Sequence, residues 1–470
     1  MDHIPNEILS HILSYLLTDR EKRRLRKDSI CHVLPVRLVC RRWNDLATKH
    51  LFRTSEDTIE DDFASWHQLL ETDSIRNAIR RVNIETAPWD SALEEGNAIL
   101  FWPDSWLENG YWPEFASAID RIRDMPNLNS ITLRFSLFCL TAERDDTVFQ
   151  EPKGTRERTL ELISEVLRNR ESRPGRSTVR ELVLSNLEDT PLPTDLTHSL
   201  LRNIDQLHMR FVYEVEDRES NVFSKYLQKT LLPSVAERLV ELTLAGWLWG
   251  AIPVEFNPKG LSFPRLKRLK LDNFMIIRQD QFDWVLEQRS LVDLQLYNTR
   301  IATHCVLLAV DQDDFEYWGV NLHGWKELAN NHEVNGPPLG SILNTPHSGE
   351  LRPGWYMSDL RWSNMFDRIQ QHLPLLRNFT FEHSDFEDFL EHYPGSPEVY
   401  CMGERYWTYG EGGWSTMWYK PAREHEWEAT PFLEDDMSGT PVGLYERTEA
   451  ADRRALEKLM EVTRKRREGK

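Results

Sequence analysis

The residues that could carry out chemistry gather before one tryptophan. Asp313, Asp314 and Glu316 precede Trp318. Enzymes that cleave glycosidic bonds use two carboxylates and aromatic platforms, so this group is the strongest catalytic candidate in the sequence. The chain holds 76 acidic residues, however, and neighbours of this kind are then expected by chance. No acid is paired with a base at a defined distance, and the sequence predicts no catalytic residue.

The motifs of other common active sites are absent from the sequence. It contains no GxSxG elbow, no HExxH metal helix, no Walker loop and no GxGxxG turn. The five cysteines are scattered, with no CxxC pair and no Cys/His cluster at the spacing of metal ligands. We therefore expect no enzyme activity, no cofactor, no metal and a reducing compartment.

Two amphipathic segments form a head at the start of the sequence. In IPNEILSHILSYLL, residues 4–17, aliphatic residues recur at spacings of three and four after Pro5, which predicts a helix with one apolar face. In PVRLVCRRWNDLATKHLFRT, residues 35–54, the same spacing predicts a second helix from Pro35, with Cys40 as a small buried hydrophobe. About 50 residues bury too little surface to be stable alone, so this head should dock on another surface.

Charge separates the head from the rest of the chain. Residues 1–53 carry eleven basic and six acidic residues, a net charge of +5, and the chain total of −19 leaves −24 for the remainder. Phosphate binding needs a basic footprint, so nucleic acid is excluded as the main partner. No run of about 18 apolar residues could cross a membrane, and the start MDHIPNEILS lacks the features of a secretory signal. We expect an intracellular protein, cytoplasmic or nuclear.

The head resembles the F-box, the helical module by which substrate receptors of cullin-type ubiquitin ligases dock on the Skp1 adaptor. The resemblance rests on three features of the sequence. They are the start Ile4-Pro5, which is similar to the Leu-Pro of that module, the spaced aliphatic residues and the VCxxW core. Ile4 replaces the usual leucine, and the connection from Leu17 to Leu34 is longer than the usual short turn. The resemblance implies that the adaptor contact is made by Ile4, Pro5, Ile8, Leu9, Ile12, Leu13, Leu38, Val39, Cys40 and Trp43.

The resemblance further implies a non-catalytic substrate-receptor subunit of an SCF-type ligase. Such a subunit binds the adaptor and, through it, a cullin, and it holds a protein substrate that the sequence does not identify. Two other functions stay open: a scaffold that uses the F-box without ubiquitylation, and a small-molecule receptor or hydrolase built on the aromatic segments. The head could also be an ordinary helical cap on the body.

The body is predicted from a pattern that returns after residue 75. An apolar residue is followed by others three and five positions later, and the last two form the period-2 pair of a strand with one buried face. Helix-like segments such as TLELISEVLRNR precede most copies. The copies are IRRVNI, LNSITL, VRELVL, IDQLHM, LVELTL, LKRLKL, LVDLQL and LRNFTF.

Helix followed by strand, repeated, is typical of a leucine-rich repeat array. The spacing of the copies varies, and Asn186, Asn273 and Asn298 lie two residues after the last apolar position instead of three. The predicted fold class is therefore an α/β repeat, in which a helical F-box precedes an irregular leucine-rich-repeat-like solenoid with a capped C-terminal end. This resembles the divergent repeats that follow the F-box in many fungal receptors. A conventional α/β sheet is the alternative.

Alternation along the strands predicts two different faces. One face should be buried, and the other should form a surface for a partner, which the negative charge of the body predicts to be basic. The buried set is Leu184, Leu244, Leu271 and Leu296, and the outward set is Val183, Thr243, Lys270 and Gln295.

Four domains follow from these patterns. They are the F-box module at 1–53, the repeat array at 54–383 with an insertion at about 297–375, an aromatic-rich cap at 384–445, and a C-terminal helix with a basic tail at 446–470.

The cap contains RYWTYGEGGWSTMWYK, which predicts two aromatic strands, Tyr406–Tyr409 and Trp414–Tyr419. These strands either cover the last repeat or form an aromatic substrate pocket. The basic residues Arg464–Arg467 are interpreted as complementing a helix dipole rather than as a nuclear import signal.

Overall fold

The structure, a computed structural model, consists of helices and mainly parallel strands. The described residues are 5–16, 34–52, 54–55, 63–86, 103–136, 139–140, 151–212, 221–251, 255–307, 322–327, 354–383, 405–409 and 444–469. Contacts divide the chain into two compact units, Met1–Glu188 with Leu192–His208 and Asp189–Pro191 with Met209–Lys470.

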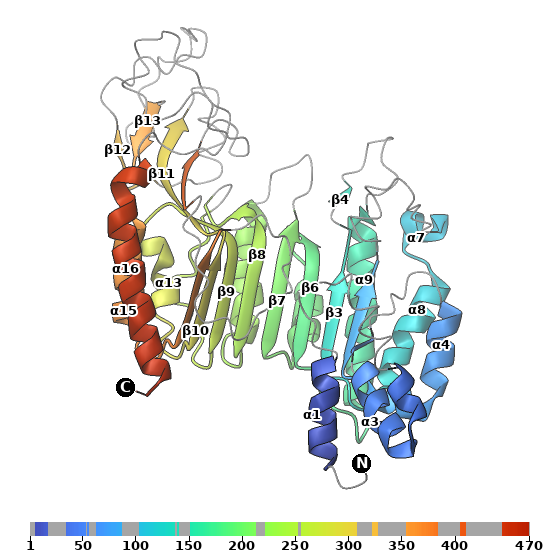
Figure 1. Ribbon diagram of the computed structural model, residues 1–470. Coiled ribbons are helices and arrows are strands. Elements are labelled where there is room, and N and C mark those ends of the chain that lie inside the picture. Colours follow the sequence, from blue (N-terminus) through green and yellow to red (C-terminus); the bar gives the residue numbers. More distant parts are fainter. Residues whose placement is uncertain are drawn as a thin grey trace. The chain divides into compact units, whose positions relative to one another are not determined.

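The first unit contains the helical head and a set of parallel strands (Figure 1). Strands β1, β2, β3 and β6 pair in this order, which places Ile84, Leu133 and Leu184 at paired positions. The helices are α1 (Asn6–Leu16), η2 (Leu34–Leu38), α3 (Arg41–Leu51), α4 (Phe63–Glu71), α5 (Asp73–Ala78), α7 (Asp104–Asn109), α8 (Pro113–Asp120), η3 (Arg121–Asp124), α9 (Lys153–Glu171) and α10 (Thr194–Leu201). The strands are β1 (Thr54–Ser55), β2 (Arg81–Glu85), β3 (Ser130–Arg134), β4 (Cys139–Leu140), β5 (Glu151–Pro152) and β6 (Glu181–Glu188).

The division between the units falls within β7 (Gln206–Val212), and the second unit repeats the arrangement of strands and helices. Strands β8, β9, β10 and β14 pair in parallel, and Leu244, Leu271, Leu296 and Phe381 occupy paired positions. The strands are β8 (Glu241–Trp249), β9 (Arg268–Ile276), β10 (Asp293–Tyr297), β11 (Arg300–Leu307), β12 (Lys326–Glu327), β13 (Gly354–Met357), β14 (Asn378–Glu382) and β15 (Tyr406–Tyr409). The helices are α11 (Asn221–Tyr226), η4 (Leu227–Leu231), α12 (Leu232–Val235), η5 (Asp280–Phe282), α13 (Asp283–Leu286), α15 (Trp362–His372) and α16 (Leu444–Arg467).

All eight copies of the repeated pattern form strands, namely β2, β3, β6, β7, β8, β9, β10 and β14. The last two apolar residues of every copy are at most 2 % exposed. Their burial explains the pattern, since parallel pairing places equivalent apolar side chains side by side. An α/β chain with a parallel, open sheet is therefore confirmed.

The outward positions of these strands differ from the expectation. Thr243, Lys270 and Gln295 are 1 %, 3 % and 6 % exposed, and Val183 is also buried, so the expectation that these four side chains are exposed is wrong. Neighbouring side chains on a sheet shield one another, as Lys270 shows, because its Nζ lies 4.4 Å from the ring centroid of Tyr297.

The displaced asparagines mark bends in the strands. Asn186, Asn273 and Asn298 have φ angles of 59°, 55° and 46°, and among the described residues these are the non-glycine positions with positive φ. Asparagine tolerates this left-handed conformation better than most residues. Beyond Asn273, strand β9 pairs with β11 instead of β10, through Met275 and Arg300. The asparagine therefore lies where the sheet changes strand partners.

The described part of the predicted insertion, 297–375, contains regular secondary structure. It contains β11, which pairs in parallel with β9 and β15 and antiparallel with β13, and it contains the helix α15. The predicted aromatic strand Tyr406–Tyr409 is present as β15, whereas Trp414–Tyr419 lies outside the described residues.

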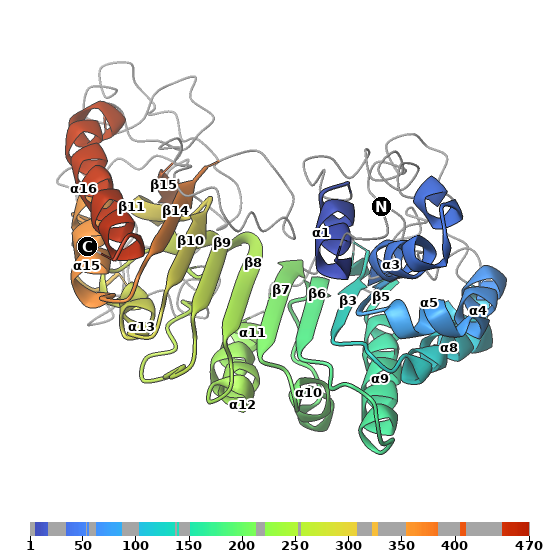
Figure 2. The ribbon, with the colours of Figure 1, turned by 60° about the horizontal axis from the view of Figure 1, so that its bottom comes forward.

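The C-terminal helix α16 lies beside α15, as the two views agree, and contacts both of its ends (Figure 1, Figure 2). At the start of α15, the backbone N–H of Ser363 donates to Asp452 Oδ1 at 2.9 Å. At its end, Arg466 donates to the carbonyl oxygen of Leu373 at 2.7 Å. A carboxylate at the N-terminus and a guanidinium at the C-terminus both suit the dipole of α15. Arg466 in the basic tail therefore complements a helix dipole, as the sequence predicts. The dipole is that of α15, however, and not that of its own helix α16.

Asp452 also attaches strand β15 to α16. Arg405 Nε and the Tyr406 hydroxyl donate to Asp452 Oδ2 at 2.9 and 2.8 Å. Arg405 is 2 % exposed and Asp452 is fully buried. Burial and the neighbouring carboxylate raise the pKa of the Tyr406 phenol, which therefore remains a donor. One carboxylate thus joins α15, α16 and β15.

Replacing Asp452 with alanine should lower the free energy of unfolding of the second unit by about 3 to 5 kcal/mol, because it leaves Arg405 buried without its main partner. Urea denaturation followed by tryptophan fluorescence measures this loss. Lys458→Ala is the matched control, since its exposed ion pair with Asp367 joins the same two helices and contributes at most about 1 kcal/mol. Equal losses in the two variants would contradict this account of Asp452.

Candidate docking surface

The head contains an apolar cluster of its own. Leu13 and Ala47 are fully buried, and Trp43 and Leu46 pack against them together with Val36 and Leu51. Leu9, one turn before Leu13 on α1, is 1 % exposed. The two helices therefore meet through one stripe of α1, which contains Leu9 and Leu13.

Polar contacts join the same two helices. Arg42 Nε donates to Asn6 Oδ1 at 2.7 Å, and Ser10 Oγ lies 2.7 Å from His50 Nε2. Each contact links one residue of α1 with one of α3, so the position of α1 on α3 is fixed by hydrogen bonds as well as by the apolar cluster.

The second predicted helix is divided into two elements. Residues Leu34–Leu38 form the 3₁₀ helix η2, and α3 begins only at Arg41. Cys40 precedes α3 with an extended backbone, φ −165° and ψ 171°, and its side chain is exposed. The prediction of a buried Cys40 within a continuous helix is therefore wrong, because the chain turns before α3 and directs this segment to solvent.

The head exposes four large apolar side chains. On α1, Ile8 and Ile12 are 51 % and 43 % exposed, and before α3, Leu38 and Val39 are 87 % and 62 % exposed. We call these four residues the docking face. Large apolar side chains exposed in groups mark interaction surfaces in soluble proteins. Elsewhere in the described chain, exposure of this kind is limited to the separate residues Tyr111, Val222 and Leu375.

The residues expected to contact an adaptor thus fall into two groups. Pro5 and Cys40 are exposed together with the docking face. Leu9 and Leu13 are buried, and Trp43 is half-buried in the cluster. Ile4 lies outside the described residues. Helical spacing alone does not separate the two groups, because it does not show where α3 packs on α1.

The head continues directly into the sheet of its unit. Strand β1, Thr54–Ser55, pairs in parallel with the start of β2, at Arg81 and Val82. The sequence does not predict this strand, since two residues are too few to show alternation. The domain boundary at residue 53 therefore remains a prediction, and it lies next to a strand pairing.

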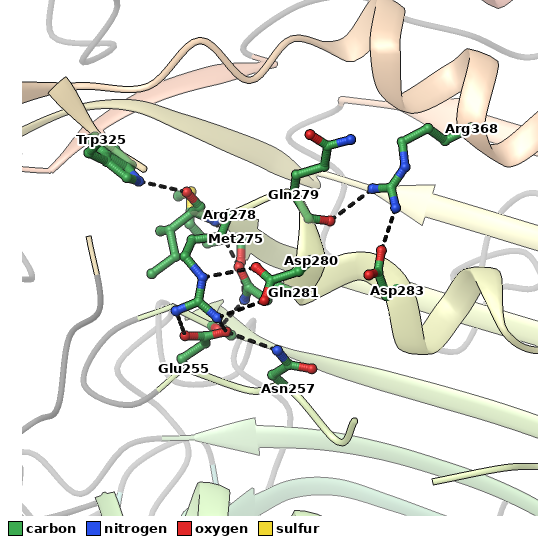
Figure 3. A network of polar contacts seen from close by, with 12 residues as sticks. Glu255, Asn257, Met275, Arg278, Gln279, Asp280, Gln281, Asp283, Trp325 and Arg368 are labelled. Carbon is green, nitrogen blue, oxygen red and sulfur yellow. Dashed lines mark hydrogen bonds and ion pairs between the residues drawn. The ribbon is translucent and has the colours of Figure 1, made fainter. Parts of the chain in front are cut away.

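A network of polar contacts follows the carboxyl ends of β8 and β9 (Figure 3). Arg278 forms ion pairs with Glu255 at 2.7 Å and with Asp280 at 2.9 Å. Burial raises the pKa of the Glu255 carboxyl, and Arg278 opposes this effect. Trp325 Nε1 donates to the carbonyl oxygen of Ile277 at 2.9 Å. These contacts join separate loops, so we interpret the network as structural.

No group of His, Cys, Asp and Glu side chains in the described ranges could hold a metal ion. Burial raises the pKa of the Cys305 thiol, which disfavours the reactive thiolate. The carboxylates before Trp318 lie outside the described residues. Among the described helices, none combines the length and apolar character needed to span a membrane.

Comparison with known proteins bears on the head. A family model described as F-box-like matches residues 1–55. None of the curated proteins matches the chain. The matched segment contains the docking face, the apolar cluster and strand β1, and it supports the presence of an F-box in this protein.

The two groups of head residues should respond differently to truncation. Leu13→Ala should destabilise the head by about 2 to 5 kcal/mol, because it creates a cavity in the cluster. Ile12→Ala, on the exposed side of the same helix, should change stability by no more than about 0.5 kcal/mol. Hydrogen exchange of the α3 amides in the full chain measures both effects. Similar loss of protection in both variants would refute the division.

Proposed function

We propose that this protein is a non-catalytic substrate-receptor subunit of an SCF-type ubiquitin ligase. The observation that carries the proposal is an exposed apolar docking face within the segment that matches an F-box-like domain. F-box domains in general bind Skp1-like adaptors, and through such an adaptor the protein would reach a cullin. We expect this role in the cytoplasm, the nucleus or both.

In this proposal the docking face contacts the adaptor directly. Burial of its four side chains removes apolar surface from water, which at about 25 cal/mol per Å² is a substantial driving force for association. Pro5 and Cys40 lie at the rim of the contact, and Ile4 is assigned to the same contact. Leu9, Leu13 and Trp43 act through the shape of the head, because they hold α1 against α3.

The remainder of the chain would hold the substrate. We propose that the strands and helices after residue 53 form an irregular leucine-rich-repeat-like array, supported by the eight strands that carry the repeated pattern. Such a receptor performs no bond-making step. It increases the rate of ubiquitin transfer by holding substrate lysines close to the charged enzyme, an effect of proximity.

Replacing Ile8 and Val39 together with aspartate should weaken adaptor binding by about 100-fold or more. Two apolar contacts are lost and two carboxylates are desolvated, and each 1.4 kcal/mol corresponds to a factor of ten. Titration of the purified full chain with a Skp1-type adaptor measures the affinity. Tyr111→Asp is the control, because Tyr111 is 64 % exposed and lies outside the head.

Both variants should keep the unfolding temperature of the wild type, since all three side chains are exposed. Unchanged adaptor affinity in the double variant would contradict the docking face. Co-purification from cells after proteasome inhibition tests the rest of the proposal: recovery of adaptor without cullin would favour a scaffold that does not support ubiquitylation.

A further inference from the structure

Three carboxyl groups lie on the outward face of the strands in the second unit. Asp272 on β9 and Glu382 on β14 are the neighbours of Tyr297 in the two pairings of β10. Asp293 begins β10, four residues before Tyr297, so alternation places it on the same face. We call Asp272, Asp293 and Glu382 the acidic strip. All three residues are half-buried.

The cations around the acidic strip do not offset its desolvation. Burial raises the pKa of Asp272, Asp293 and Glu382, and in each case this effect exceeds the lowering by neighbouring groups. Lys270 lies near both Asp272 and Glu382, Arg210 and Arg300 are further cations near Asp272, and Arg268 is near Asp293. A carboxylate that is poorly hydrated and incompletely paired gains more from an additional cation than an exposed one does.

An independent observation also points to a ligand on this face. Gln295 lies between Asp293 and Tyr297 on β10 and is 6 % exposed. Its Nε2 donates to Asp293 Oδ1 at 3.1 Å, whereas its Oε1 has no hydrogen-bond partner. A buried acceptor without a donor is unfavourable, so the face lacks a donor at this position.

We propose that the acidic strip and Gln295 bind a basic, extended segment of a protein substrate. The inference rests on the proposed function, because it assigns the segment to a substrate. Lysine and arginine side chains supply an additional positive charge for the carboxyl groups and N–H donors for the amide oxygen of Gln295. The net charge of −19 on the chain favours the approach of such a segment.

The test uses the full chain and two fluorescent peptides, one alternating lysine with threonine and one alternating glutamate with threonine. Fluorescence anisotropy at low and at moderate salt should show tighter binding of the lysine peptide. Asp293→Asn combined with Glu382→Gln should weaken that binding about ten-fold and reduce its dependence on salt. Glu237→Gln combined with Glu287→Gln changes the charge equally at exposed positions after α12 and α13, and should have no such effect.

Gln295→Leu separates the role of the acceptor from that of charge. It should weaken binding of the lysine peptide at both salt concentrations without changing the salt dependence, provided that thermal unfolding is unchanged. Equal binding of the two peptides, or an equal loss in the Glu237/Glu287 variant, would overturn the inference. Adaptor binding, measured on the same samples, reports the proposed function separately: its absence beside a preserved preference for lysine would refute only that function.

Discussion

The structure depends on the alignment of equivalent apolar side chains across parallel strands. In each unit, the residue that ends the repeated pattern pairs with its counterpart on the next strand, as Leu244, Leu271 and Leu296 do in the second. A slip of one residue would move every such side chain to the opposite face, so burial specifies the register. The variable segments between the strands are tolerated because they do not enter these pairings.

The head applies the same principle on a smaller scale. Leu9 and Leu13 are buried against α3, whereas Ile8 and Ile12, on the same helix, remain exposed. A helix with aliphatic residues on more than one stripe can pack on two partners, one within the chain and one outside it. The exposed stripe is costly for an isolated protein, and this cost is removed when a partner covers it. The docking face is therefore the feature that best connects the fold to a function.

Polar groups in the second unit serve different purposes. Asp452 is fully buried and meets several donors, so it fixes the helices and strand that it contacts. The acidic strip is half-buried and incompletely neutralised, and one amide oxygen beside it has no donor. The first arrangement is complete within the chain, and the second is suited to an external cation. The distinction rests on whether each polar atom has its partner.

The sequence by itself determined the strands and the type of head. The period-2 pair in each repeat and the aliphatic spacing in residues 4–17 follow from local geometry, which the chain imposes wherever one face is buried. The sequence could not show the break at Cys40, the exposure of Val39 or the burial of Lys270, because each depends on which segment packs beside it. Likewise, the asparagines were visible as displaced residues, but their role required the change of strand partners near Asn273. Alternation specifies which side chains share a face, whereas only tertiary packing decides whether that face meets protein or solvent.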